Sequence, residues 1–248
     1  QILMLVTTTN KLIGVTPTIT DAGTGELAAN ISDPDHSLNY TCGSSTANFT
    51  VSYGARTNIS YVGISGHNAA TPANATVQLY DGATLIDAVT IKRNHNIMFT
   101  FAAMSFTDLK VVFITTPLTY QTTLSFVAAG QHLTIASGEQ SGYKRAWLNR
   151  STMQKTTTNL SVAPVSSTIK SKSLKGSLSF PNEAASFSEG DWQDFIDFSF
   201  DQPFFIKEQV SKPESSYLCF NPAHDINAHS QTRGLNVIML KFTAFNGL

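Results

Sequence analysis

The segment from Ala75 to Ile91, ATVQLYDGATLIDAVTI, constrains the fold more than any other part of the chain. Apolar and polar residues alternate on both sides of Asp81-Gly82, and a period of two is the spacing of a β-strand that buries one face. The Asp-Gly pair tolerates the positive φ that a tight hairpin turn requires. The segment therefore predicts two antiparallel strands that turn at Asp81-Gly82.

The same strand pattern runs through the first 136 residues. Short stretches rich in Val, Ile, Thr, Phe and Tyr are separated by Gly, Pro, Asn and Asp, and helical spacing is nearly absent. The further predicted strands lie within residues 47–53, 58–65, 97–106, 109–118 and 122–135. Short strands at this spacing are typical of a jelly roll, so residues 1–136 are predicted to form a jelly-roll β-sandwich.

Residues 137–176 differ in texture, because they are polar, rich in Ser and Thr, and poor in large apolar residues. Such a segment buries little surface of its own, so any order in it has to come from a neighbour. We predict a polar arm, which is either a linker or an extended strand that docks on a neighbouring subunit.

Residues 177–248 are predicted to form a second β-rich region with one short helix near 188–197. In the helix Trp192, Phe195 and Ile196 fall on one face, and Ser188 is placed to cap it. The fold class is therefore all-β: a jelly-roll sandwich followed by a second β-rich region that carries a short helix.

Charged residues make up 13% of the chain, against about 25% in typical soluble domains. With a net charge of -1 and no basic run, the sequence argues against nucleic acid as a partner. No apolar run reaches the roughly 18 residues of a membrane-spanning helix, and no secretory signal is predicted. Cys42 and Cys219 are predicted to be free thiols, with their pairing left open.

No group of residues has the spacing of a catalytic site. Asp191, Asp194 and Asp197 follow one strip of the predicted helix, where they indicate a solvated face rather than an acid and base pair. His67 and His95 lie in loops without a nucleophile beside them. The sequence predicts a protein that is not an enzyme, with no catalytic residues and no cofactor.

One segment, NPAHDINAHS, gathers His224, Asp225 and His229. These side chains can ligate a divalent ion, but their spacing matches no ligand motif and the segment contains turn-forming residues. We predict a surface loop here and no metal site.

Aromatic side chains are the remaining candidates for a site. Tyr143, Trp147 and Trp192 can stack on the apolar face of a sugar ring, or they can belong to the core or to a subunit interface. All three are kept as candidate glycan or interface residues.

The first region resembles the discoidin-like, galactose-binding-like jelly rolls. The resemblance is carried by YVGISGHNAATPANATVQLYDG, by LKVVF and by AAGQHLTI. With GHN at the corner, the region also resembles structural proteins of tailed bacteriophages in tail, tail-tip or fibre-associated positions. YKRAWLN, DWQDFID, QPFFI and LNVIMLKFTAF fit that second resemblance further along the chain.

This resemblance implies a non-enzymatic structural component of a bacteriophage virion, in the tail or at the attachment of tail tip or fibre. Such a protein is made in the cytoplasm of the bacterial host, and its partners are other virion proteins and copies of itself. The alternative is a carbohydrate-binding module of the phage tail that recognises a host surface glycan. An enzyme that degrades polysaccharide ranks last, because no pair of carboxylates is placed for it.

Overall fold

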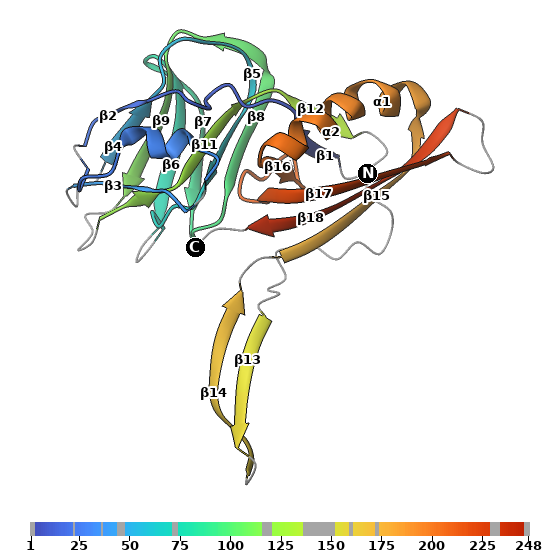
Figure 1. Cartoon of the computed structure of the whole chain (residues 1–248). Helices are drawn as coiled ribbons and strands as arrows, with labels where there is room; N and C mark the ends of the chain where they lie inside the picture. The colour runs from blue at the N-terminus through green and yellow to red at the C-terminus, as the bar shows by residue number, and fades with distance from the viewer. Residues whose placement is uncertain are drawn as a thin grey trace.

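The structure is a computed structural model that describes residues 3–21, 23–35, 37–43, 48–70, 74–115, 121–135, 152–158, 161–171, 174–228 and 234–245. Two β-rich units lie side by side in Figure 1, a sandwich and a sheet with helices on one face. The predicted fold class is confirmed. None of the described helices is long and apolar enough to cross a bilayer.

The sandwich packs a five-stranded sheet against a three-stranded sheet. The first has the order β2 (Thr18–Ile19), β4 (Asn48–Ser52), β9 (Leu109–Thr115), β6 (Ala75–Asp81) and β7 (Thr84–Ile91). The second has the order β11 (Phe126–Gly130), β5 (Arg56–Ser65) and β8 (Ile97–Phe106). A two-stranded sheet of β3 (Tyr40–Thr41) and β10 (Thr123–Leu124) and the 3-10 helix η1 (Ala28–Ser32) complete this unit.

Alternation along the strands builds the sandwich core. In β6, Val77 and Leu79 are fully buried, whereas the alternating residues Thr76 and Gln78 are partly exposed. The rings of Phe49 and Phe113 stack with their centroids 4.6 Å apart. Burial of these apolar side chains supplies the main favourable free energy of folding.

The predicted hairpin between β6 and β7 is confirmed. Asp81 pairs with Thr84, so the turn residues are Gly82 and Ala83. Gly82 has a φ of +58°, a backbone conformation that glycine adopts without strain.

The second unit is a six-stranded antiparallel sheet with helices on one face (Figure 1). Its order is β12 (His132–Ile135), β1 (Met4–Thr7), β16 (Phe204–Lys207), β17 (Ser216–Ala228), β18 (Leu235–Phe245) and β15 (Leu174–Ala184). The helices are α1 (Ala185–Glu189) and α2 (Asp191–Asp201).

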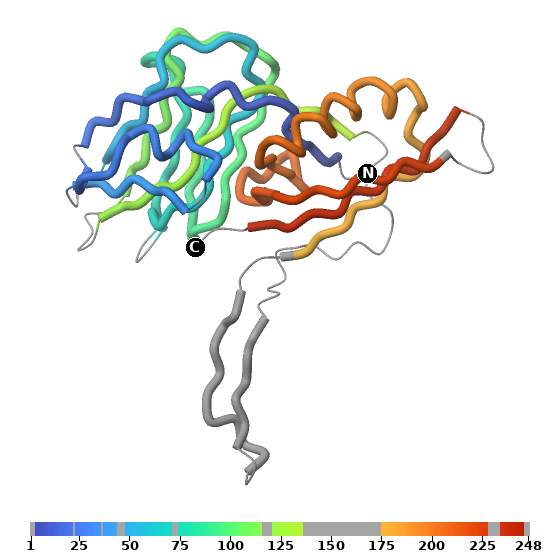
Figure 2. The backbone as a smooth tube through the Cα atoms, in the orientation of Figure 1, coloured from blue at the N-terminus to red at the C-terminus, as the bar shows by residue number. Residues whose placement is uncertain are grey.

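The boundary expected at residue 136 does not separate the two sheets. β1 and β12 lie in the first 136 residues, yet both belong to the six-stranded sheet, where Leu5 pairs with Thr134 on one side and with Lys207 on the other. The colours of Figure 2 show this directly, because the blue start of the chain runs beside orange and light-green segments. The sandwich is therefore inserted between two strands of the second unit.

The polar arm is shorter than the predicted 137–176, since β15 already begins at Leu174. Within it, β13 (Thr152–Thr158) and β14 (Ser161–Ser171) pair with each other. Its other residues lie outside the described part of the chain. The choice between a linker and a docking strand stays a prediction.

A third apolar cluster joins the two units. On β16, Phe204 and Ile206 face the helices, whereas Phe205 faces the sandwich together with Leu218. There Phe205 stacks on Phe126, with ring centroids 6.4 Å apart. A Cβ on Gly63 would lie 2.6 Å from the ring of Phe205, so this contact requires glycine.

Three local predictions are wrong. The segment that contains His224 and Asp225 is part of strand β17, not a surface loop, because its residues pair with β18. His229 lies outside the described residues. Ser188 does not cap the main helix: it lies inside α1, and its hydroxyl donates to the carbonyl oxygen of Ala185. The helical part spans 185–201 in two pieces rather than 188–197.

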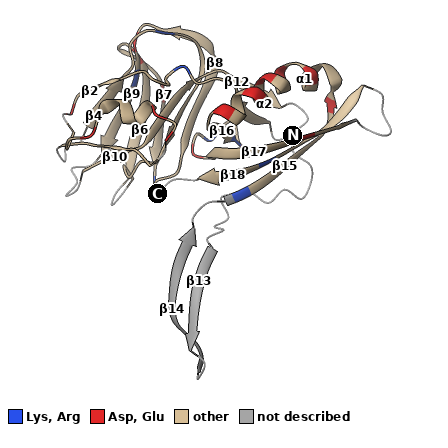
Figure 3. Cartoon of the chain, viewed as in Figure 1, with Lys and Arg blue, Asp and Glu red and all other residues tan. Residues whose placement is uncertain are grey.

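Other predictions hold. Asp191, Asp194 and Asp197 are exposed, and acidic residues recur along α2 in Figure 3. Cys42 and Cys219 are both buried and free. Burial raises the pKa of the Cys42 thiol to about 12, so it stays protonated at neutral pH.

Candidate binding site

A pocket lies where the sandwich meets the second unit, and we name it the junction pocket. Its volume is about 560 Å³, within the range of about 300–1,000 Å³ for small-molecule sites. One wall is the segment that leads from β7 to β8, and the other is the connection from β16 to β17. The lining residues are Val89, Lys92, Arg93, His95, Gln209, Ser211, Lys212, Pro213, Glu214, Ser215 and Tyr217.

The sandwich wall is held by buried hydrogen bonds. His67, fully buried in the GHN corner, lies with Nε2 2.8 Å from the carbonyl oxygen of His95, and since a carbonyl only accepts, the imidazole donates. Ser65 donates to the side-chain oxygen of Asn96 at 2.8 Å, and the backbone N–H of Ala70 donates to Asn94 at 2.9 Å. The GHN corner thus supports this pocket wall from behind.

His67 is neutral at physiological pH. Burial lowers its pKa to about 4, and Nδ1 has no hydrogen-bond partner among the described residues. A proton on Nδ1 would place an unsatisfied donor and a charge in the interior.

The opposite wall is an ordered turn. The backbone N–H groups of Glu208 and Gln209 donate to the carbonyl and hydroxyl oxygens of Ser215, at 3.0 and 2.9 Å. The N–H of Met98, on β8, donates to the carbonyl oxygen of Pro213 at 2.9 Å. This last bond ties the two walls together, so the pocket is formed before any ligand arrives.

The pocket lining combines apolar residues with polar groups. Val89, Pro213 and the buried Tyr217 supply apolar surface, and Gln209 and Ser211 supply an amide and a hydroxyl. Saccharides have both apolar ring faces and many hydroxyl groups, and a lining of this mixed kind complements both.

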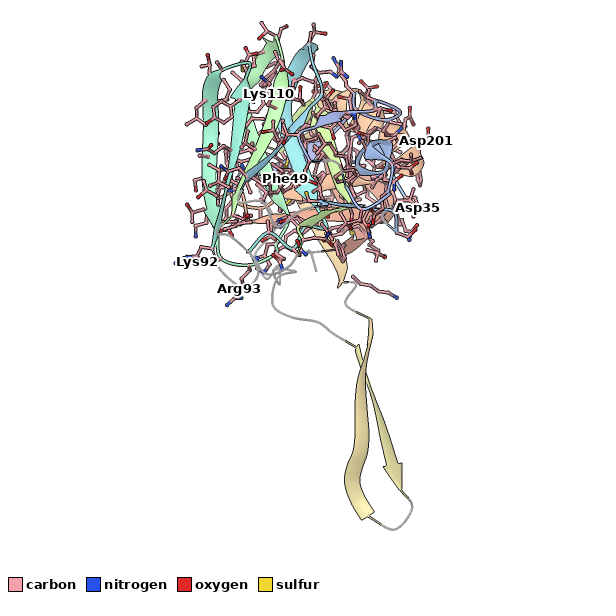
Figure 4. The ribbon with its side chains drawn as sticks, turned by 90° about the vertical axis from the view of Figure 1, so that its left-hand side faces the viewer. Asp35, Phe49, Lys92, Arg93, Lys110 and Asp201 are labelled. Carbon is pink, nitrogen blue, oxygen red and sulfur yellow. The ribbon has the colours of Figure 1, made fainter. Side chains whose placement is uncertain are left out.

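Positive charge dominates the pocket. Lys92, Arg93 and Lys212 are exposed cations, and Glu214 is the only carboxylate among the lining residues. In Figure 4 the side chains of Lys92 and Arg93 project from one end of the sandwich. Burial lowers the pKa of His95, which counts against a charge on its ring at neutral pH.

A second, shallower pocket of about 380 Å³ lies on the outer face of the five-stranded sheet, and we name it the sheet pocket. Its lining residues are Thr18, Thr20, Thr50, Ser52, Tyr80, Gly82, Ala83, Lys110 and Val112. Here the polar groups satisfy one another: Lys110 pairs with Asp108 at 3.0 Å, and Ser52 donates to Asp108 at 2.6 Å.

The aromatic residues singled out from the sequence do not line either pocket. Trp192 is fully buried, and its ring packs against Phe180, Phe195 and His224. Since no face of the indole is open to solvent, the prediction of a sugar-stacking role is wrong for this residue. Tyr143 and Trp147 lie outside the described residues.

Among the residues that the structure describes, two serine–histidine pairs occur, and neither is arranged as a nucleophile and base in an open site. Ser199 is buried and donates to the carbonyl oxygen of Ile196, so His224 donates to its hydroxyl oxygen rather than accepting its proton. Ser60 is 6% exposed, and His132 Nδ1, 2.9 Å from its hydroxyl, also lies 3.1 Å from the carbonyl oxygen of Ser60. Since a carbonyl only accepts, Nδ1 carries a proton and does not act as a base toward the hydroxyl. The described residues contain no group of His, Cys, Asp and Glu that could hold a metal ion.

Sequence reasoning missed the junction pocket because its walls are far apart in the chain. Lys92-Arg93 and Lys212 each stand alone as an exposed basic spot. The only local signal is the turn-forming composition of KRNHN and SKPESS, which predicts exposed loops but not their meeting.

No family model matches the chain, and no curated protein does. Among solved structures it is similar to a chitosan-binding module of a chitosanase/glucanase from Paenibacillus sp. IK-5, with 18% identity over 50% of this chain and 99% of that one and a TM-score of 0.37. A fucose-binding module from Streptococcus pneumoniae is 14% identical over 49% of this chain and 94% of that one, with a TM-score of 0.39. A family 32 carbohydrate-binding module of C. perfringens NanJ, solved with galactose, is 15% identical over 48% of this chain and 93% of that one, with a TM-score of 0.37. We transfer no residue role from them.

Proposed function

We propose that this chain is a non-catalytic carbohydrate-binding module that takes its saccharide in the junction pocket. The observation that carries the proposal is the pocket itself: a cavity lined by apolar residues and by hydrogen-bonding groups from both units. Binding in a rigid, preformed site avoids the cost of ordering loops on association.

The pocket suits a saccharide better than other ligand classes. It lacks the glycine-rich loop at a helix N-terminus that is typical of dinucleotide- and nucleotide-binding sites. It gathers three cations in one small site, whereas the affinity of a protein for nucleic acid depends on many phosphate contacts along an extended basic surface. The described residues also offer no open catalytic pair beside it.

For the biological context of this module we keep the proposal that follows from the sequence resemblance. We retain a phage tail as the proposed context, with a host surface glycan as the ligand, and other virion proteins and further copies of the chain as partners. Assembly in the bacterial cytoplasm and residence in the virion are parts of the same proposal.

The test is a glycan array probed with the full chain and with two blocking variants. Ser211→Trp places a large side chain at an exposed position of the junction pocket, and Thr18→Trp does the same in the sheet pocket. We expect glycan binding that Ser211→Trp abolishes and Thr18→Trp leaves intact. An array without hits, or hits that both variants retain, would refute the proposal.

A further inference from the structure

The three cations of the junction pocket come from both of its walls. Lys92 and Arg93 follow the end of β7 on the sandwich, and Lys212 lies in the connection from β16 to β17. Their meeting results from the packing of Phe205 and Leu218 on the sandwich and from the bond between Met98 and Pro213. The fold therefore concentrates charge that the sequence keeps apart.

Within the described part of the chain, none of these cations is paired with a carboxylate. No other described residue forms an ion pair with Lys92, Arg93 or Lys212, whereas Lys110 on the sheet pocket is paired with Asp108. Against the three cations the lining offers one carboxylate, Glu214, in a chain whose net charge is -1. A surplus of positive charge in a concave site raises the local concentration of anions and favours their binding.

Resting on the proposed function, we propose that the junction pocket selects acidic saccharides, meaning sugars that carry a carboxylate or a phosphate group. The guanidinium of Arg93 can take such a group with two parallel hydrogen bonds, and the ammonium groups of Lys92 and Lys212 add point charges. Val89 and Pro213 in the lining supply apolar surface for the sugar ring.

The experiment compares charge-matched variants of the full chain on an array that holds uronate-, sialate- and phosphate-bearing glycans beside neutral ones. In one variant Arg93→Gln is combined with Lys212→Gln. The control combines Lys175→Gln with Lys241→Gln, which removes the same charge from exposed positions on strands β15 and β18. The best acidic hit is then titrated by calorimetry at low and high salt, and its neutral methyl ester serves as the ligand control where the acidic group is a carboxylate.

We expect acidic hits, with affinity at least about 10-fold lower in the pocket variant and unchanged in the control. Raising the salt should weaken binding to the wild-type chain more than binding to the pocket variant, because the lost interaction is electrostatic. Uronate and sialate hits identify a carboxylate as the recognised group, and phosphosugar hits identify a phosphate.

Two results overturn the inference while leaving the proposed function standing. One is neutral glycans binding as tightly as acidic ones, with Ser211→Trp abolishing both. The other is acidic binding that the pocket variant retains at full affinity. Binding to single-stranded oligonucleotides that exceeds binding to every glycan would overturn both proposals.

Discussion

The two pockets differ in what their polar groups contact. In the sheet pocket Lys110 Nζ lies 3.0 Å from Asp108 and 3.2 Å from the carbonyl oxygen of Gly82, so its charge and donors are already used. In the junction pocket the charges of Lys92, Arg93 and Lys212 are met by no ion pair with a described residue. The first arrangement ties the central strand β9 to the β6–β7 turn, whereas the second leaves interaction capacity for a ligand.

They also differ in how they are built. The sheet pocket lies on one sheet and close to the β6–β7 turn, so neighbouring strands form it. The junction pocket exists only while the two units remain packed together. In Figure 4 Lys110 and the pair Lys92 and Arg93 lie at opposite ends of the sandwich. A change at the junction should therefore affect one pocket and spare the other.

The largest expected effect comes from loosening the junction. Phe205→Ala removes a buried ring between the units and should lower the free energy of unfolding by about 3–5 kcal/mol. Hydrogen exchange should accelerate in β5, β11 and the β16–β17 connection, while β4 and β9 below the sheet pocket stay protected. Denaturant titration and exchange mass spectrometry measure both effects.

Phe204→Ala is the matched control, since Phe204 is the preceding residue and faces the helices. It should accelerate exchange in α2 rather than in β5 and β11. If the two variants give the same exchange pattern, the junction is not a separable structural element.

The next effect concerns the wall behind the junction pocket. The folded-state pKa of His67 is about 4, below its ordinary value of 6.5, so the unfolded chain binds more protons between these values. Stability is therefore fully present above pH 6.5 and falls as the pH drops toward 4, by a contribution on the order of 3 kcal/mol.

His67→Gln removes the titration and keeps an N–H donor for the carbonyl of His95. The pH dependence of stability between 6.5 and 4 should become shallower in this variant. An unchanged slope would show that His67 does not titrate as described. His224, whose pKa burial also lowers to about 4, is the same in both proteins and cancels in the comparison.

A smaller effect on stability is expected at Lys207, a cation that is buried at the junction, unlike the exposed cations of the pocket. Lys207 is 1% exposed, donates to Thr100 at 2.8 Å, and has its pKa lowered to about 8 by burial. Lys207→Met should raise the free energy of unfolding at pH 7 by about 1–3 kcal/mol. The unfolded chain binds more protons between pH 8 and 10.5, so this gain should vanish as the pH rises across that window. Equal gains at pH 7 and 10.5 would contradict the assignment.

The smallest effect compares one lysine from each pocket. Lys110→Gln should cost less than about 1 kcal/mol of stability, because its ion pair is partly exposed, and should leave saccharide binding unchanged. Lys212→Gln should leave stability within about 0.5 kcal/mol and weaken the binding of an acidic saccharide. Reversal of the two outcomes would mean that the roles of the pockets are exchanged.

Local patterns in the sequence predict much of the fold. The alternation in β18 buries Ile238, Leu240 and Phe242 against the helices as expected, and the apolar strip of α2 buries Trp192 and Phe195. These features succeed because each depends on the spacing of residues within one element.

Long-range pairing is what the sequence does not reveal. Nothing near Leu5 indicates that β1 pairs with β16 across most of the chain. The sequence around His224 predicts a surface loop because proline and asparagine mark turns, but pairing with β18 overrides that local preference. The candidate site could not be predicted from the sequence for the same reason, since Arg93 and Lys212 come to line one pocket only after both units have formed and packed.

The most direct test of the account is a crystal structure of the full chain with the tightest acidic saccharide from the array. The account predicts the sugar in the junction pocket, its acidic group in contact with Arg93 and Lys212, and its ring over Val89 and Pro213. A saccharide bound at the sheet pocket beside Tyr80 and Lys110, with the junction pocket free of ligand, would contradict it.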